Sequence, residues 1–193
     1  MTRFEIAISK IDEYNKKDPN LAIEEGKKIP KEYLDSIRQS SWLKKLNPDA
    51  SEHLKLAVRS QHIGRWEISR NTYPDNRAGY LNWRSDLLKY HSEITSNTLQ
   101  EAGFNSETIE KVKTLNLKKS IKLDPEAQML EDVLCLVFLE FYISEFHVQH
   151  PREKVINIIQ KTWKKMGNAG RENALQINYK PEVLSLLKEA LEF

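Results

Sequence analysis

The chain has 193 residues, of which 39% are hydrophobic and 30% are charged, and its formal net charge is +2. This balance is typical of a globular protein and excludes a disordered chain, and the low net charge lacks the polybasic character of a general nucleic-acid-binding protein. The longest apolar run, residues 133–139, is far shorter than the roughly 20 residues that a membrane-spanning helix needs.

The sequence favours the cytoplasm. No apolar segment typical of a signal peptide follows Met1, and the single cysteine, Cys135, has no partner for an internal disulfide. Cys135 lies inside the apolar run, so we expect a buried thiol there. We therefore expect a cytoplasmic protein without a membrane partner.

In chain order, the first part of the sequence alternates helical segments with turns. Apolar positions at helical spacing predict helices over residues 4–14, 30–46 and 54–62. The connection up to Pro30 is polar and contains the breaker Asp18-Pro19-Asn20, and Asn47-Pro48-Asp49 is a second turn. Residues 64–79 are predicted as a loop, because Tyr73-Pro74-Asp75-Asn76 is a strong turn signal.

The second part contains longer helices, one of which is apolar on nearly every side. Helical spacing predicts helices over residues 80–102, 106–115, 125–146, 153–166 and 181–191. Asp124 and Pro125 suit the start of the third of these, and its apolar circumference predicts a central, buried helix. Residues 167–170 are predicted as a loop, and no segment predicts a convincing strand. The predicted fold class is therefore all-α, with a single domain over residues 1–193.

Polar side chains within apolar helices are the strongest candidates for chemistry. Glu131 and Asp132 are adjacent in the central helix, where successive residues differ by about 100°, so we expect one of them to point into a polar cavity. His62 ends an apolar helix and His91 lies in the middle of another. Together with Asp132 they could hold one divalent ion, which imidazole and carboxylate donors would allow to be iron, manganese, zinc or nickel. Alternatively, His62 is a hydrogen-bonded core histidine and Asp132 pairs with an arginine.

A second candidate is a segment in which arginines and large aromatic residues alternate. Arginine binds phosphate or carboxylate oxygens with two parallel hydrogen bonds, and aromatic rings stack on bases. This composition predicts a pocket for a phosphorylated or nucleotide-like ligand. Alternatively, the arginines pair with the chain's own acids and tryptophans and fix a long loop. The residues proposed to bind the ligand are Arg65, Trp66, Arg70, Arg77 and Arg84.

Long motifs in this sequence resemble those of the domain of unknown function 4202 family, over nearly the whole chain. That resemblance implies no activity. The motifs are Gln61-His62-Ile63-Gly64-Arg65-Trp66-Glu67-Ile68-Ser69-Arg70, Tyr73-Pro74, Arg77, Gly79-Tyr80-Leu81, Trp83-Arg84, Leu130-Glu131-Asp132-Val133, Cys135-Leu136-Val137-Phe138-Leu139-Glu140 and Lys161-Thr162-Trp163-Lys164-Lys165-Met166.

A more distant resemblance is to the HD-domain phosphohydrolases. The run that ends in Ile63-Gly64-Arg65 is similar to their helix-plus-turn, His91 to their next histidine helix, and the segment up to Asp132 to the one that carries their last metal-binding aspartate. This resemblance implies an HD-like core over residues 31–146, with the helices of residues 153–193 packed on it. Three departures concern the metal motif: the usual His-Asp pair is Gln61-His62, the first-helix histidine has no match among Tyr33-Leu34-Asp35, and Leu134 stands where the last site has a second aspartate.

These observations lead to the hypothesis of a variant HD-like, metal-dependent phosphohydrolase acting on a phosphorylated small molecule or nucleotide. In this hypothesis His62, His91 and Asp132 hold the metal, and Glu67 and Glu131 are catalytic. The alternative is a non-catalytic module that binds a nucleotide, a phosphate or an RNA end in the same pocket. A third interpretation is a structural interaction domain whose tryptophans are packing residues. No heptad repeat indicates an oligomeric state.

Overall fold

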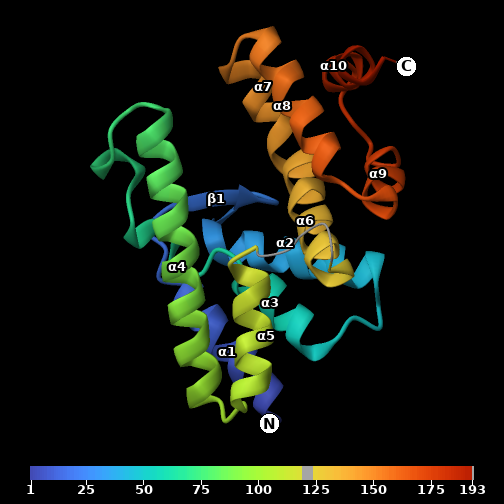
Figure 1. Cartoon of the computed structure of the whole chain (residues 1–193). Helices are drawn as coiled ribbons and strands as arrows, with labels where there is room; N and C mark the ends of the chain where they lie inside the picture. The colour runs from blue at the N-terminus through green and yellow to red at the C-terminus, as the bar shows by residue number, and fades with distance from the viewer. Residues whose placement is uncertain (119–123, 193) are drawn as a thin grey trace. The chain divides into compact units, whose positions relative to one another are not determined.

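The computed structural model describes residues 1–118 and 124–192, and the chain divides into two compact units, Met1–Ser120 and Ile121–Phe193. Both units are built almost entirely from helices, which confirms the predicted all-α class (Figure 1). The boundary between them falls inside residues 31–146, the range predicted as one core. The single domain and its HD-like core stay predictions. None of the helices described is both long and apolar enough to span a membrane.

The first unit has five helices and one small hairpin within its described residues. Side chains cap the helix starts: Thr2 and Glu5 form a capping box, and Ser51, Asn76 and Asn105 each accept a hydrogen bond from the first turn that follows. The elements are α1 (Arg3–Asn15), β1 (Leu21–Glu24), β2 (Lys27–Pro30), α2 (Lys31–Leu46), α3 (Glu52–Ser60), the 3₁₀ turns η1 (Arg65–Glu67) and η2 (Arg70–Thr72), α4 (Arg77–Glu101) and α5 (Ser106–Asn116).

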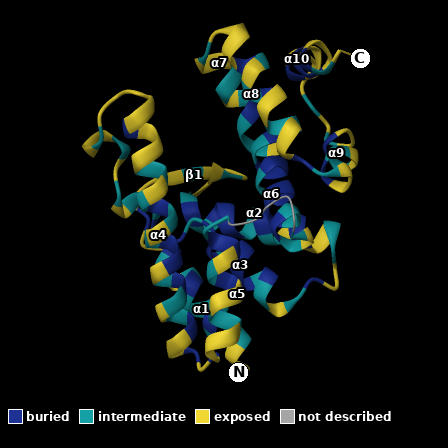
Figure 2. Cartoon of the chain, in the orientation of Figure 1, coloured by how far each residue is buried: buried dark blue, intermediate teal, exposed yellow. Residues whose placement is uncertain are grey.

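Helix α3 is the centre of this unit and packs against α1, α2 and α5. Its residues Leu56 and Ala57 are fully buried, and Figure 2 shows buried residues gathered along it. Arg59 leaves this core toward α1, where its Nε and Nη2 each donate a hydrogen bond of 2.7 Å to the carboxylate of Asp12. Such a two-bond pair holds α1 and α3 in one orientation.

The hairpin is a correction, because the connection up to Pro30 was predicted without strands. Strands β1 and β2 pair antiparallel with Glu24 opposite Lys27. The two residues between them, Glu25 and Gly26, have φ angles of 50° and 75°, the left-handed values that a two-residue hairpin turn requires. Strands of four residues are too short to show an alternating pattern in the sequence, and Glu25 is an unusual residue in such a turn.

The second unit places its most apolar helix inside, as predicted. Leu130, Val133 and Leu136 of α6 are buried, and so is the thiol of Cys135. The predicted helix over residues 125–146 is interrupted by a π-helical turn, and a short helix replaces the loop predicted for residues 167–170. The elements are α6 (Pro125–Val137), η3 (Phe138–Tyr142), α7 (Ile143–Gln149), α8 (Arg152–Lys165), α9 (Asn168–Ala174) and α10 (Pro181–Leu191).

Candidate functional site

Glu32, in the first turn of α2, carries a buried carboxylate. The Asp18 carboxylate accepts hydrogen bonds from the backbone N–H groups of Asn20 and Glu32, at 2.9 and 3.0 Å. This contact ties the chain before the hairpin to the first turn of α2, where Glu32 is only 5% exposed. The helix therefore begins with a carboxylate that faces the interior of the first unit.

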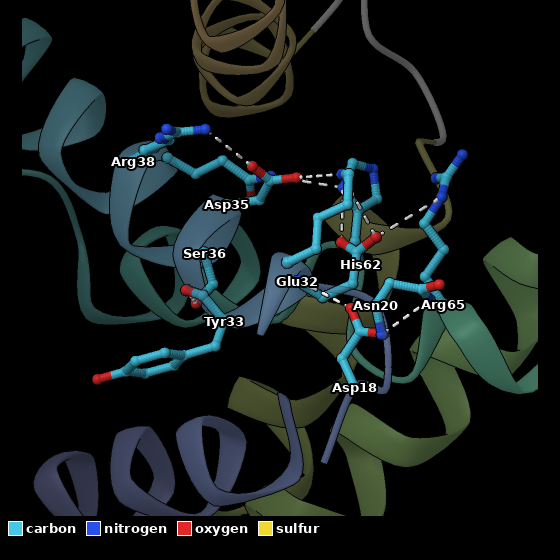
Figure 3. Close-up of polar contacts among 11 residues, drawn as sticks. Asp18, Asn20, Glu32, Tyr33, Asp35, Ser36, Arg38, His62 and Arg65 are labelled. Carbon is cyan, nitrogen blue, oxygen red and sulfur yellow. Dashed lines mark hydrogen bonds and ion pairs between the residues drawn. The ribbon is translucent and has the colours of Figure 1, made fainter. Parts of the chain in front are cut away.

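Glu32 meets two residues that follow α3 (Figure 3). Its Oε2 lies 3.9 Å from Nδ1 of His62, and its Oε1 lies 3.9 Å from Nε of Arg65. Gln39, seven residues further along α2, approaches the same imidazole. Its Nε2 lies 3.4 Å from Nδ1 of His62. Sequence reasoning missed Glu32, because an acid in the first turn of a helix is the ordinary choice there and gives no functional signal.

Gly64 turns the chain so that His62 and Arg65 can reach this place. Its φ of 69° is left-handed, and a Cβ at this position would lie 3.1 Å from ring carbons of Tyr14 and Tyr90. Both the backbone angle and the close approach of these rings require glycine. The turn also presents the carbonyl of Ile63 to the neighbouring helix α4.

His91 of α4 is brought to the site by that carbonyl. Its Nδ1 lies 2.7 Å from the oxygen of Ile63, and the side chain is 1% exposed. The only hydrogen that can lie between these two atoms belongs to the ring, so His91 donates from Nδ1 and its Nε2 carries a lone pair. The centres of the His62 and His91 rings are 6.0 Å apart. The structure thus brings the two predicted histidines together.

Burial controls the charges of these groups. Burial, with a smaller effect of the Arg65 cation, lowers the pKa of His62 well below its ordinary value and that of His91 to about 4, although the hydrogen bond to Ile63 opposes the shift of His91. Burial also raises the pKa of Glu32 to about 7, although Lys31 and Arg65 oppose this shift. At pH 7 both imidazoles are therefore neutral, while Glu32 is protonated in roughly half of the molecules.

Several buried polar atoms of the first unit have no hydrogen-bond partner within the described part of the chain. Oε2 of Glu32 and Oε1 of Gln39 belong to residues that approach His62, and both amide atoms of Gln61, the residue before His62 in the sequence, also lack a partner. A buried polar group left without a partner costs about 1–3 kcal/mol, so such groups are usually satisfied by a ligand, an ion or water. We refer to Glu32, His62 and His91 as the Glu–His–His site.

Of the predicted phosphate-binding residues, Arg65 lies at the Glu–His–His site. Its guanidinium is held over the Trp83 ring at 5.1 Å, and Trp83 in turn donates to the carbonyl of Ile68 at 2.9 Å. Trp66 turns toward α1, with its ring centre 5.8 Å from that of Tyr14. The aromatic residues therefore fix the loop and, through Trp83, the direction of Arg65.

The other predicted loop residues make contacts of their own. Arg70 donates to the carbonyl of Tyr73 at 3.0 Å, Arg84 lies 5.8 Å from the Tyr80 ring centre, and Arg77 is exposed in the first turn of α4. Glu67 is exposed in η1. The contacts of Arg70 and Arg84 agree with the alternative in which the arginines hold the loop. Their binding of a ligand, and a catalytic Glu67, stay predictions.

Asp132 and Glu131 belong to the second unit. The Asp132 carboxylate accepts hydrogen bonds from the backbone N–H of Gly167 at 2.8 Å and from Nε2 of Gln128 at 2.9 Å, so it anchors the start of α9 to α6. Glu131 is 5% exposed, with its Oε1 3.4 Å from Nζ of Lys165. Asp132 thus has an evident structural role in its own unit. A metal shared by Asp132 and the two histidines stays a prediction.

Gly170 should not tolerate a side chain, because Asp132 occupies the space beside it. A Cβ on Gly170 would lie 2.7 Å from Cγ of Asp132. We expect Gly170→Ala to lower the free energy of unfolding by about 1–3 kcal/mol, the usual range for overpacking, in urea denaturation. The exposed neighbour Ala169 provides the control: Ala169→Ser should change stability by less than about 0.5 kcal/mol. Equal stability of the two variants would contradict this close contact.

No set of three or more His, Cys, Asp or Glu side chains in the described ranges is arranged to hold a metal ion as it stands. The Glu–His–His site therefore presents its three groups near one another without closing around a centre. Its chemistry is nevertheless that of a polar cluster with two imidazole donors, one carboxylate and a cation. Such a cluster has the donor types that bind a divalent ion or a phosphate.

Comparison of the chain with curated proteins and with solved structures gave no match. The likeness to HD-domain phosphohydrolases therefore stays a prediction. The family model described as Domain of unknown function (DUF4202) matches residues 5–187, and the chain belongs to this family.

Proposed function

We propose that this protein is a metal-dependent phosphohydrolase acting on a phosphorylated small molecule or nucleotide, with the Glu–His–His site as its centre. The observation that carries the proposal is that the buried carboxylate of Glu32, with an oxygen that accepts no hydrogen bond, lies 3.9 Å from the neutral imidazole of His62, whose ring centre is 6.0 Å from that of His91. Neutral imidazole and carboxylate are the donors that iron, manganese, zinc and nickel bind in proteins. A divalent ion would supply an activated water for attack on a phosphate ester.

The contacts of His91 support a role as a metal ligand. Metal-binding histidines commonly donate the second ring N–H to a backbone carbonyl, which fixes the tautomer and the direction of the ring. The bond from His91 Nδ1 to Ile63 has this form and leaves Nε2 as the donor atom. His62 and Glu32 would complete a three-residue shell from α2, the turn after α3, and α4. Asp132, with Glu131 and Glu67 as catalytic groups, remains part of the hypothesis.

Arg65 supports the phosphate part of the proposal. Its guanidinium lies beside Glu32 and is held by Trp83, so the side chain is placed before a ligand arrives. Lys118 and Lys31 also lower the pKa of His62, so further cationic groups act at the imidazole beside which a phosphate would bind. A planar guanidinium can bind two phosphate oxygens at once, and a lysine in its place would offer only one point of charge.

The same positive charges favour a second candidate function, a phosphate-binding module without catalysis. Arg65, Lys31 and Lys118 all act on the two histidines or on Glu32, whereas the three possible ligands do not enclose a metal as they stand. In that case the protein would bind a nucleotide, a phosphate or an RNA end and leave it unchanged. Such a module would be stabilised by its ligand in the presence of a chelator.

The test is the metal content of the tag-free protein, followed by assays of p-nitrophenyl phosphate and nucleoside monophosphates. We expect about one iron, manganese, zinc or nickel per chain after soaking, and hydrolysis that EDTA abolishes and the metal restores. Arg65→Lys should raise KM about tenfold, since it loses the two-bond contact, whereas Arg152→Lys, at an exposed position of the second unit, should change KM less than twofold. A folded protein that takes up no metal would contradict the hydrolase. Thermal stabilisation by phosphate in EDTA would then favour the binding module.

A further inference from the structure

A cavity of the first unit lies apart from the Glu–His–His site and shares no residue with it. It occupies about 370 Å³ and is open to solvent on one side. Its apolar walls come from Phe4 and Ile8 of α1, Leu43 of α2 and Pro48 in the turn after α2. This volume lies within the range of small-molecule sites, roughly 300–1,000 Å³. The walls suit a hydrocarbon group and offer it little hydrogen bonding.

The cations that line the cavity have different roles. Arg59 is fully engaged, because it pairs with Asp12 and donates to the Ser36 carbonyl and the Ser40 hydroxyl. Lys44 and Lys55 also line the cavity, and neither ammonium group forms an ion pair with a described residue. An apolar pocket with two such ammonium groups is complementary to a molecule with a hydrocarbon tail and one anionic end.

We propose that this cavity binds a medium-chain carboxylate, with the tail against Phe4, Ile8 and Leu43 and the carboxylate between Lys44 and Lys55. At about 30 Å³ per non-hydrogen atom, the space that a water molecule takes in the liquid, the cavity holds about 12 such atoms. Decanoate has this size. Each methylene group removed from water strengthens binding about fourfold, so chain length determines affinity up to the size of the cavity.

The test is calorimetric titration of the full chain with decanoate, hexanoate and the uncharged decan-1-ol. Wild-type protein should bind one decanoate, with hexanoate at least about tenfold weaker and decan-1-ol about fivefold weaker. Lys44→Gln/Lys55→Gln should weaken decanoate about fivefold or more. The matched control Lys27→Gln/Lys28→Gln removes two exposed lysines from the hairpin and should leave the affinity unchanged.

Two further measurements place the ligand. Ile8→Trp fills the cavity and should abolish decanoate binding, with circular dichroism and the Tm showing that the variant is folded. Should it fail to fold, the methyl resonances of Ile8 and Leu43 in the wild-type protein decide, because both should shift on saturation with decanoate. The proposal is overturned by the absence of saturable binding, by equal affinity for decanoate and decan-1-ol, or by an affinity that the lysine pair does not change. Methyl shifts confined to other residues would also overturn it.

Discussion

Glu32→Gln is expected to stabilise the metal-free protein at pH 8 and, if the proposed function is right, to abolish its uptake of divalent metal. Burial raises the pKa of Glu32 to about 7, so the folded chain holds a proton on this group that the unfolded chain releases near pH 4.5. Stability from this group is therefore present at low pH and is lost as the pH rises from about 4.5 through 7. The neutral amide of glutamine is not subject to this loss of stability at any pH.

The expected gain at pH 8 is about 3 kcal/mol in the free energy of unfolding, and it should shrink toward zero near pH 4.5. Urea denaturation in EDTA at both values measures it. The titration of His62 and His91 occurs in both proteins and largely cancels in the comparison. Glu93→Gln, at an exposed position of α4, is the matched control and should change stability by less than about 0.5 kcal/mol at either pH. A difference that does not depend on pH would show that Glu32 is not a desolvated carboxylate.

The double variant His62→Ala/His91→Ala should lose divalent-metal binding, with the affinity lower by at least about a hundredfold. Loss of an outer-shell partner alone can cost 10- to 100-fold, and this variant removes two of the three proposed ligands. Plasma mass spectrometry of protein soaked in manganese, iron, zinc or nickel measures the metal retained after desalting. Phosphate-ester hydrolysis should fall in parallel.

Two controls separate metal loss from damage to the fold. His147→Ala/His150→Ala removes two histidines from the second unit, outside the proposed site, and should keep the metal. Because truncation of the buried His91 leaves a cavity that costs roughly 2–4 kcal/mol, the more conservative His91→Gln is measured alongside with its Tm. Full metal retention by a folded double variant would refute these histidines as ligands.

Structural features that depend on residues close together in the sequence could be predicted, whereas features that depend on distant residues could not. Some helix starts were accessible because a cap and its partners lie within four residues: Asp124, expected at the start of α6, accepts a hydrogen bond from the backbone N–H of Glu126. The burial of α6 followed from its apolar circumference. The start of α4 at Arg77 was not predicted, because Pro74 and Asn76 before it are typical of a turn.

Elements that depend on unusual backbone geometry were not predicted. The hairpin needs left-handed angles at both Glu25 and Gly26, and only the glycine suggests such angles in a sequence. The π-helical turn Phe138–Tyr142 continues the apolar pattern of α6, so periodicity does not distinguish it from an α-helix.

What the sequence determined by itself is therefore the all-α class, most helices, and the two histidines as candidates. Only the tertiary structure decided which groups they meet. Glu32 reaches His62 from 30 positions away because Asp18 holds the start of α2, and His91 is oriented by the carbonyl of Ile63 across two elements. The same packing takes these side chains out of water and so sets their charges. These side chains come together and leave water because residues far apart in the sequence pack against one another, and no local spacing in the chain encodes such packing.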